Sequence, residues 1–270
     1  MESILRPAEP ARPPAPYLGG KRYLAARIIE RIAAIPHVTY VEPFVGMGGV
    51  FLRRPFRAKA EVINDVSRDV VTLFRVLQRH YQALMDMLRW QVTSRADFDR
   101  LRMAVPDTLT DLERAARFLY LQRTAFGGRV QRRAFGVSPA TPGRFDVTKL
   151  AALLEDVHER LAGVVIECKP WADVLRLYDR PGTLFYLDPP YWGCETDYGD
   201  GVWSKADFTA LADVLGRLQG SFILSLGDRP EVRRVFDGFR IEEVMTTYGI
   251  NNARSIPARE LIITPRSAPT

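Results

Sequence analysis

The segment Asp188-Pro189-Pro190-Tyr191, which follows the apolar run 183–187, carries the strongest chemical signal in the sequence. Its prolines lack N–H donors and stiffen the chain. The Asp188 carboxylate and the Pro189 carbonyl can therefore converge as two acceptors on an exocyclic amine, which has two N–H donors to offer. Tyr191 adds an aromatic face on which a base can stack, a contact worth about 1–3 kcal/mol. The segment predicts a site for the amino group of a nucleobase; a rigid corner without a ligand is the structural alternative.

A second signal is the glycine turn at 44–49 (FVGMGG), which follows the apolar run 39–44. Glycines let the backbone bend sharply and let a nucleoside approach closely. Asp65 ends the next apolar run, 17 residues after Gly48. A carboxylate at that place accepts hydrogen bonds from ribose hydroxyls, although Asp65 could instead cap a helix expected at 66–79. Together, these features indicate a nucleoside cofactor at the carboxyl ends of a sheet.

A third signal is a run of arginines. Between Arg114 and Phe145 there are seven arginines and no acidic residue, in a chain whose formal net charge is +6. Arginine binds phosphates, or reads guanine through two parallel hydrogen bonds worth about 1–3 kcal/mol. Phe126 and Phe135 lie among these arginines. We expect this stretch to contact a nucleic acid, and a solvated basic face is the alternative.

The elements that must position these residues form an α/β pattern. Apolar runs predict seven strands, and helical periodicity between most of them predicts crossover connections and a largely parallel sheet. The last two runs have no helix between them, which predicts an antiparallel edge hairpin. The expected strands are 39–44, 60–63, 163–167, 183–187, 221–226, 239–245 and 259–264, and the expected helices of the core are 21–35, 170–179, 204–218 and 229–236.

Domain organisation follows from where this alternation stops. Residues 66–160 show helical patterns only, together with a Gly-, Arg- and Pro-rich loop at 125–146. We therefore expect a helical insertion at 66–160 within a core formed by 16–65 and 161–270. Residues 1–15 are rich in proline, and we expect them to form a disordered arm.

Composition narrows the class of protein. The chain has 270 residues, of which 47% are hydrophobic and 26% charged, close to the globular average. It has no apolar run long enough for a membrane span and no secretory signal at its start. Two cysteines, Cys168 and Cys194, and three scattered histidines form neither a disulfide framework nor a metal-ligand spacing. We expect a cytoplasmic protein without a bound metal and without membrane association.

These motifs together resemble the Dam-like DNA adenine methyltransferases, the D12 class of N6-adenine methylases. The resemblance covers nearly all of residues 16–264. It rests on PYLGGK at 16–21, YVEPFVGMGGVFL at 40–52, VINDVSRDVVTLF at 62–74, YLQRTAFGGRVQRRAFGV at 120–137, YLDPPYWG at 186–193 and RELIIT at 259–264.

The resemblance implies a Rossmann-like, seven-stranded, S-adenosylmethionine-dependent methyltransferase whose insertion at 66–160 recognises double-stranded DNA as a target-recognition domain. Enzymes of this kind act on a flipped adenine at a specific site, often within restriction–modification systems, and we expect a monomer. The catalytic residues implied are Asp188, Pro189, Pro190 and Tyr191. The cofactor-binding residues implied are Tyr17, Lys21, Phe44, Gly46, Gly48, Asp65 and Asp188. The DNA-binding residues implied are Arg123, Phe126, Arg129, Arg132 and Arg133.

Other functions fit parts of the pattern. A nicotinamide dehydrogenase would explain the glycine turn and Asp65, but not the segment 188–191 or the insertion. A DNA-binding relative without activity would not need Asp65 and Asp188. An amino-methyltransferase acting on cytosine N4, or on adenine in RNA, would use the same segment. The sequence does not define the recognition site, for which family precedent suggests GATC.

Overall fold

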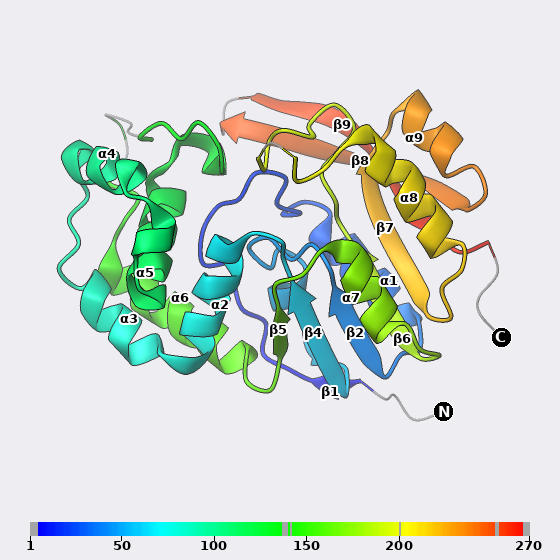
Figure 1. The fold of residues 1–270 in the computed structure, drawn as a ribbon, viewed down its shortest axis with the longest axis horizontal. Coiled ribbons are helices and arrows are strands. Elements are labelled where there is room, and N and C mark those ends of the chain that lie inside the picture. Colours follow the sequence, from blue (N-terminus) through cyan, green and yellow to red (C-terminus); the bar gives the residue numbers. More distant parts are fainter. Residues whose placement is uncertain (1–4, 137–139, 141, 200, 252–253, 267–270) are drawn as a thin grey trace.

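The computed structural model describes residues 5–136, 140, 142–199, 201–251 and 254–266. Its centre is a twisted seven-stranded sheet (Figure 1). The strands are β2 (Thr39–Glu42), β4 (Ala60–Asn64), β5 (Val165–Glu167), β6 (Thr183–Leu187), β7 (Ser221–Gly227), β8 (Arg240–Asn251) and β9 (Arg254–Thr264).

The sheet has the spatial order β5-β4-β2-β6-β7-β9-β8. Strands β5, β4, β2, β6 and β7 are parallel, whereas β9 runs antiparallel to both β7 and β8. This confirms the predicted fold class, including the antiparallel hairpin at the edge. Both hairpin strands extend beyond the predicted 239–245 and 259–264, because their outer halves pair only with each other and lack the apolar pattern of strands that pack on a core.

Each face of the sheet has its own hydrophobic core, because alternate side chains of a strand point to opposite faces. Leu184 and Tyr186 of β6 face one core, whereas Phe185 and Leu187 face the other. Helices cover both faces (Figure 1). The first core lies under α1 (Ala25–Ala34), and the second lies under α7 (Trp171–Tyr178), α8 (Lys205–Leu215) and α9 (Pro230–Val235).

Helices also fill the described part of 66–160, to one side of the sheet (Figure 1). They are α2 (Arg68–Arg79), α3 (Tyr81–Leu88), α4 (Arg95–Met103), η2 (Pro106–Thr108), α5 (Asp111–Thr124), η3 (Phe126–Gly128) and α6 (Val147–Arg160). Helix α5 begins with a capping box between Thr110 and Glu113 and is buried along most of its length. The core of this region is continuous with the core under α1, so the helices pack on the sheet domain rather than around a separate centre.

The expectation of a disordered N-terminal arm is wrong for residues 5–15; residues 1–4 lie outside the described part of the chain. Strand β1 (Arg6–Pro7) pairs with β3 (Phe56–Arg57), and the Ala11 N–H donates to the Leu52 carbonyl at 2.8 Å. Ala11 is buried in the first core. Proline restricts the unfolded chain as much as the folded one, so a proline-rich segment with small apolar residues can be ordered at low entropic cost. Part of the surface that this N-terminal segment covers is formed by the 3₁₀ turn η1 (Phe51–Arg53).

No helix in the described residues is both long and apolar enough to cross a membrane.

Candidate active site

Three predicted site segments meet at one edge of the sheet. The turn at 44–49 follows β2, Asp65 follows β4 and Asp188 follows β6, and these three strands are parallel neighbours in the order β4-β2-β6. The carboxyl ends of parallel strands lie at the same edge, where open α/β sheets bind their ligands. The fold therefore brings together residues that lie more than 100 positions apart in the chain.

Asp65 fixes the glycine turn. One carboxylate oxygen accepts a hydrogen bond from the Gly46 N–H at 2.9 Å, and the other accepts one from the Ser67 N–H at 2.8 Å. Burial raises the pKa of Asp65 to about 6, although both backbone donors oppose the shift. The alternative that Asp65 caps the helix is wrong, because the N-cap of α2 is Ser67; Asp65 instead accepts from the Ser67 N–H, just before the helix. Each oxygen keeps a further lone pair for a ribose hydroxyl.

Tyr17 packs against the same turn. Gly46 has a φ of 50°, and a Cβ at this position would lie 3.0 Å from Cε1 of the Tyr17 ring. Tyr198 lies on the Tyr17 ring with a centroid distance of 5.9 Å, and its hydroxyl donates to the Leu18 carbonyl at 2.9 Å. Sequence reasoning missed Tyr198, because it lies in an irregular segment where no periodicity marks its position.

The segment around Tyr17 is also tied to the loop after α5. The Gln122 side chain donates to the Pro16 carbonyl at 2.8 Å and to the Gly128 carbonyl at 2.6 Å. The Leu18 N–H donates to the same Gly128 carbonyl at 3.0 Å. A Cβ at Gly128 would lie 3.0 Å from backbone atoms of Pro16 and Tyr17, so glycine permits this close approach.

The Asp188 corner, by which we mean residues 188–191, is held from two sides. Lys21 Nζ lies 2.7 Å from Asp188 Oδ1, and Ser225 Oγ donates to the same oxygen at 3.1 Å. Among the described residues, Oδ2 has no hydrogen-bond or ion-pair partner. Burial raises the pKa of Asp188, and the neighbouring Lys21 opposes this shift. The side chain of Lys21 is 5% exposed and that of Asp188 is 19% exposed, so the Asp188 carboxylate is partly accessible to solvent while Lys21 is buried.

The other residues of the corner are also fixed. Pro189 and Pro190 are buried. The Tyr191 hydroxyl donates to Glu260 Oε2 at 2.7 Å, and Lys21 Nζ lies 4.7 Å from the centre of the Tyr191 ring. Sequence reasoning missed Ser225 as a partner of Asp188 and gave no role to Glu260. Both lie in apolar strands, and a polar residue inside such a run was the available signal.

Three predicted cofactor residues have other neighbours. A Cβ at Gly48 would lie 2.8 Å from the Leu52 side chain, so its left-handed φ of 71° serves packing of the turn against the core. Phe44 makes an edge contact with Trp203 at 5.5 Å between ring centres and packs on the second core. Lys21 was predicted to bind cofactor, and the structure places it on Asp188.

The arginine run separates into two groups. Arg114 lies 2.5 Å from Asp69 and 2.8 Å from Asp107, and it is buried together with Arg117. The expectation that the whole stretch contacts a nucleic acid is therefore wrong for Arg114 and Arg117, because α2 and η2 place the Asp69 and Asp107 carboxylates beside them inside the protein.

The second group lies in or next to the arginine loop, by which we mean residues 125–136. Arg129, Arg132 and Phe126 are exposed there. Arg133 turns inward and donates to the Gln122 side chain at 3.2 Å. Arg123, in the last turn of α5, donates to the Pro14 carbonyl at 2.8 Å. Residues 137–139 and 141 of the predicted loop 125–146 lie outside the described residues.

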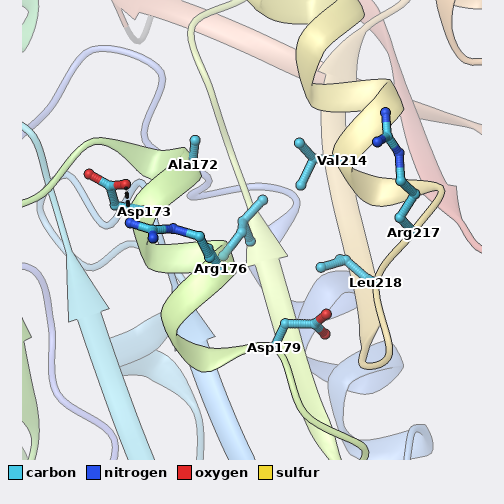
Figure 2. Close-up of a pocket in the computed structure, with 8 residues that line it drawn as sticks. Ala172, Asp173, Arg176, Asp179, Val214, Arg217 and Leu218 are labelled. Atoms are coloured by element: carbon cyan, nitrogen blue, oxygen red, sulfur yellow. Dashed lines mark hydrogen bonds and ion pairs between the residues drawn. The ribbon is translucent and has the colours of Figure 1, made fainter.

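A hollow of about 360 Å³ lies between α7 and α8 and contains none of the predicted site residues (Figure 2). Its charged groups are engaged locally. Asp173 pairs with Arg176 at 2.9 Å, and Asp179 accepts from the backbone of Gln219 and Gly220. Nothing in this lining matches the chemistry at the carboxyl edge of the sheet. Among the described residues, no group of three or more His, Cys, Asp or Glu side chains is placed to hold a metal ion.

The strand order, with two acidic residues and a glycine turn at its carboxyl edge, defines the class: a Rossmann-like methyltransferase fold. The chain matches the family model of the D12 class N6 adenine-specific DNA methyltransferases over residues 17–250, and it belongs to that family.

Curated relatives agree with this assignment. The chain is 24% identical over 203 residues to the type II methyltransferase M.CviBI of Paramecium bursaria Chlorella virus NC1A, covering 74% of this chain and 77% of that protein. It is 25% identical over 284 residues to a DNA adenine methylase of Haemophilus influenzae, covering 96% and 95% of the two chains. Among solved structures, a putative RNA methyltransferase of Pyrococcus horikoshii aligns with a TM-score of 0.40 and 9% identity, over 92% of this chain and 88% of that one.

Proposed function

We propose that this protein transfers a methyl group from S-adenosylmethionine to the N6 amine of an adenine flipped out of duplex DNA at a specific site. The observation that carries the proposal is the state of Asp188. Lys21 and Ser225 both bind Oδ1, which orients the carboxylate and leaves Oδ2 for an incoming donor. An amine is the donor that such an oxygen and the Pro189 carbonyl suit together.

The residues present fit the cofactor. Asp65 is held by two backbone donors and keeps lone pairs for ribose hydroxyls, while Gly46 and Tyr17 form the wall beside it. We assign cofactor binding to these three residues, and we assign Gly48 to the shape of the turn. S-adenosylmethionine, when bound, supplies an electrophilic methyl group.

The chain's own residues then act by positioning. Removing a base from the stack costs a few kcal/mol, and stacking on Tyr191 offsets part of that cost. The Asp188 carboxylate and the Pro189 carbonyl accept the two N–H groups of the amine, which draws the nitrogen toward sp³ character and directs its lone pair away from both acceptors. Orientation of this kind lowers a reaction barrier by roughly 7–11 kcal/mol. The buried prolines 189 and 190 keep both acceptors in place.

A cysteine nucleophile has no place in this scheme. Cys194 is close to the Asp188 corner in sequence, but desolvation and the neighbouring Asp197 raise the pKa of its thiol. A thiol with a raised pKa is not activated for attack. Transfer is direct, without a covalent enzyme intermediate.

We assign DNA contact to the helical region 66–160 as a target-recognition domain, with Phe126, Arg129 and Arg132 at its exposed loop. Arg133 positions that loop through its contact with Gln122, whereas Arg123 joins the end of α5 to Pro14.

The test is methyl transfer from tritiated S-adenosylmethionine to DNA, followed by nucleoside analysis of the product. We expect label in N6-methyladenine for the natural chain and none above background for Asp188→Ala. Asp173→Ala, which removes an exposed carboxylate beside the hollow between α7 and α8, is the matched control and keeps full activity. Label in N4-methylcytosine, or transfer to RNA alone, would replace the proposed substrate. Sequencing that maps N6-methyladenine in host DNA after expression then identifies the recognition site.

A further inference from the structure

The segment RELIIT at 259–264 forms the end of β9, and the catalytic scheme above does not use it. Within it, Glu260 is 1% exposed, and its Oε2 accepts the hydrogen bond from the Tyr191 hydroxyl at 2.7 Å. A carboxylate buried on a strand is costly unless it is well partnered. One of its partners here is Tyr191, the aromatic residue on which the flipped base is proposed to stack.

A second contact with Tyr191 comes from the neighbouring strand. Gly227 of β7 stands directly opposite Glu260 in the antiparallel pairing of β7 with β9. A Cβ at position 227 would lie 3.1 Å from Tyr191 Cδ2 and 3.6 Å from Cε2. One pair of facing residues therefore determines two things about Tyr191: Glu260 holds the hydroxyl, and Gly227 leaves room for the ring.

We infer that Glu260 is a positioning residue, which holds the Tyr191 ring in the orientation that receives the flipped base; this inference rests on the proposed function. A hydrogen bond to an ionised acceptor is roughly twice as strong as one between neutral groups. An aromatic ring with only two side-chain torsions is well fixed once its far end is bound. Glu260 thus acts on the base through Tyr191 and does not itself touch it.

Two other roles for Glu260 make different predictions. If it only stabilises the fold, its replacement affects unfolding and all ligands together. If it acts through its charge, which contributes to the raised pKa of Asp188, its replacement shifts the pH profile of methylation even without the Tyr191 hydroxyl.

The first experiment is a double-mutant cycle on Glu260 and Tyr191, read out as the single-turnover rate of methylation. We expect Glu260→Leu and Tyr191→Phe each to slow the reaction about tenfold, and the double variant to be no slower than either one. Glu260→Gln keeps an acceptor oxygen and restores most of the rate. Additive losses, or equal losses in Glu260→Gln and Glu260→Leu, would overturn the inference.

The second readout separates stacking from fold stability. The affinities for S-adenosylmethionine and for duplex DNA should remain within about twofold in Glu260→Leu, because neither contacts Glu260. Target DNA with an abasic site opposite the adenine lowers the cost of flipping. This DNA should therefore increase the single-turnover rate of Glu260→Leu by a larger factor than that of the natural chain. Equal acceleration of both would contradict a role in holding the base.

Gly227→Ala keeps the hydrogen bond between Tyr191 and Glu260 but places a methyl group against the Tyr191 ring. This variant replaces Glu260→Leu in the test if Glu260→Leu does not fold. We expect a severalfold slower single turnover with an unchanged cofactor affinity, and a natural rate would overturn the inference. If the natural chain does not methylate adenine at all, the proposed function fails and this inference fails with it. If the natural chain is active and Asp188→Ala is not, loss of the coupling between Glu260 and Tyr191 refutes the inference alone.

Discussion

The Asp188 corner and the arginine loop show two ways of building a functional surface. In the corner, Lys21, Ser225 and Glu260 come from three separate parts of the chain to bind two side chains. In the arginine loop, Arg129 and Arg132 are exposed, while the inward arginine Arg133 braces the loop against Gln122. The corner is therefore fixed by the sheet, whereas the exposed arginines of the loop can vary without disturbing the core; on the proposed function, the first sets the geometry of methyl transfer and the second contacts DNA.

Asp188→Ala is expected to have the largest effect. Loss of the acceptor removes the orientation of the amine, and we expect the single-turnover rate to fall at least about a thousandfold. The variant should keep its cofactor affinity within roughly tenfold in calorimetry and its fold by circular dichroism. A rate near that of the natural chain would show that the corner does not hold the reacting amine.

The arginine loop is tested by Arg129→Ala combined with Arg132→Ala. Two lost phosphate contacts should reduce the slope of log affinity against log salt by about 1.8, and should weaken DNA binding roughly 10- to 100-fold at moderate salt. Arg176→Ala combined with Arg217→Ala removes the same charge from the hollow between α7 and α8 and should leave both quantities unchanged. An unaltered salt slope in the loop variant would identify Arg129 and Arg132 as part of a solvated face.

Lowering the pH tests the proposed cofactor contact of Asp65 separately from the proposed DNA contact of the arginine loop. The ionised form of Asp65 is the better acceptor for ribose hydroxyls, and its raised pKa of about 6 means that this form is lost as the pH falls through that value. We expect the dissociation constant for S-adenosylmethionine to rise about tenfold between pH 7 and pH 5. Calorimetry at both pH values measures it. Asp65→Asn should bind weakly at both, and a pH dependence that persists in this variant would belong to another group.

Ser225→Ala is expected to have the smallest effect. It removes one of the two donors to Asp188 Oδ1 while Lys21 remains, and a single hydrogen bond of this kind corresponds to about a three- to tenfold change. The loss should appear in the single-turnover rate and not in DNA affinity. A thousandfold loss would show that Ser225, rather than Lys21, is the main support of the carboxylate.

Much of the fold follows from the sequence. All seven strands of the sheet, the antiparallel edge and the placement of Asp65 and Asp188 at one edge were predicted, because apolar periodicity reports which strands are buried and parallel strands share an edge. The two short strands β1 and β3 were not predicted, since two-residue pairings leave no periodic pattern.

Partners between distant segments were not predictable. The sequence places Glu113 and Asp111 near Arg114 in its own helix, but the carboxylate that Arg114 binds at 2.5 Å is Asp69, which only the fold brings to it. Likewise, Ser225 and Glu260 lie within apolar strands, and their contacts with the Asp188 corner depend on the order of β6, β7 and β9 in the sheet. Roles that depend on which strands are neighbours require the structure.

The hydrogen bonds from Gln122 to Pro16 and Gly128 couple the loop after α5 to the segment around Tyr17. The turn that precedes the exposed arginines and the peptide that carries Tyr17 share one amide group, so neither can shift without the other. If the turn contacts DNA and Tyr17 lies beside the cofactor, as proposed, then cofactor affinity in the presence and absence of DNA should differ by more in the natural chain than in Gln122→Ala.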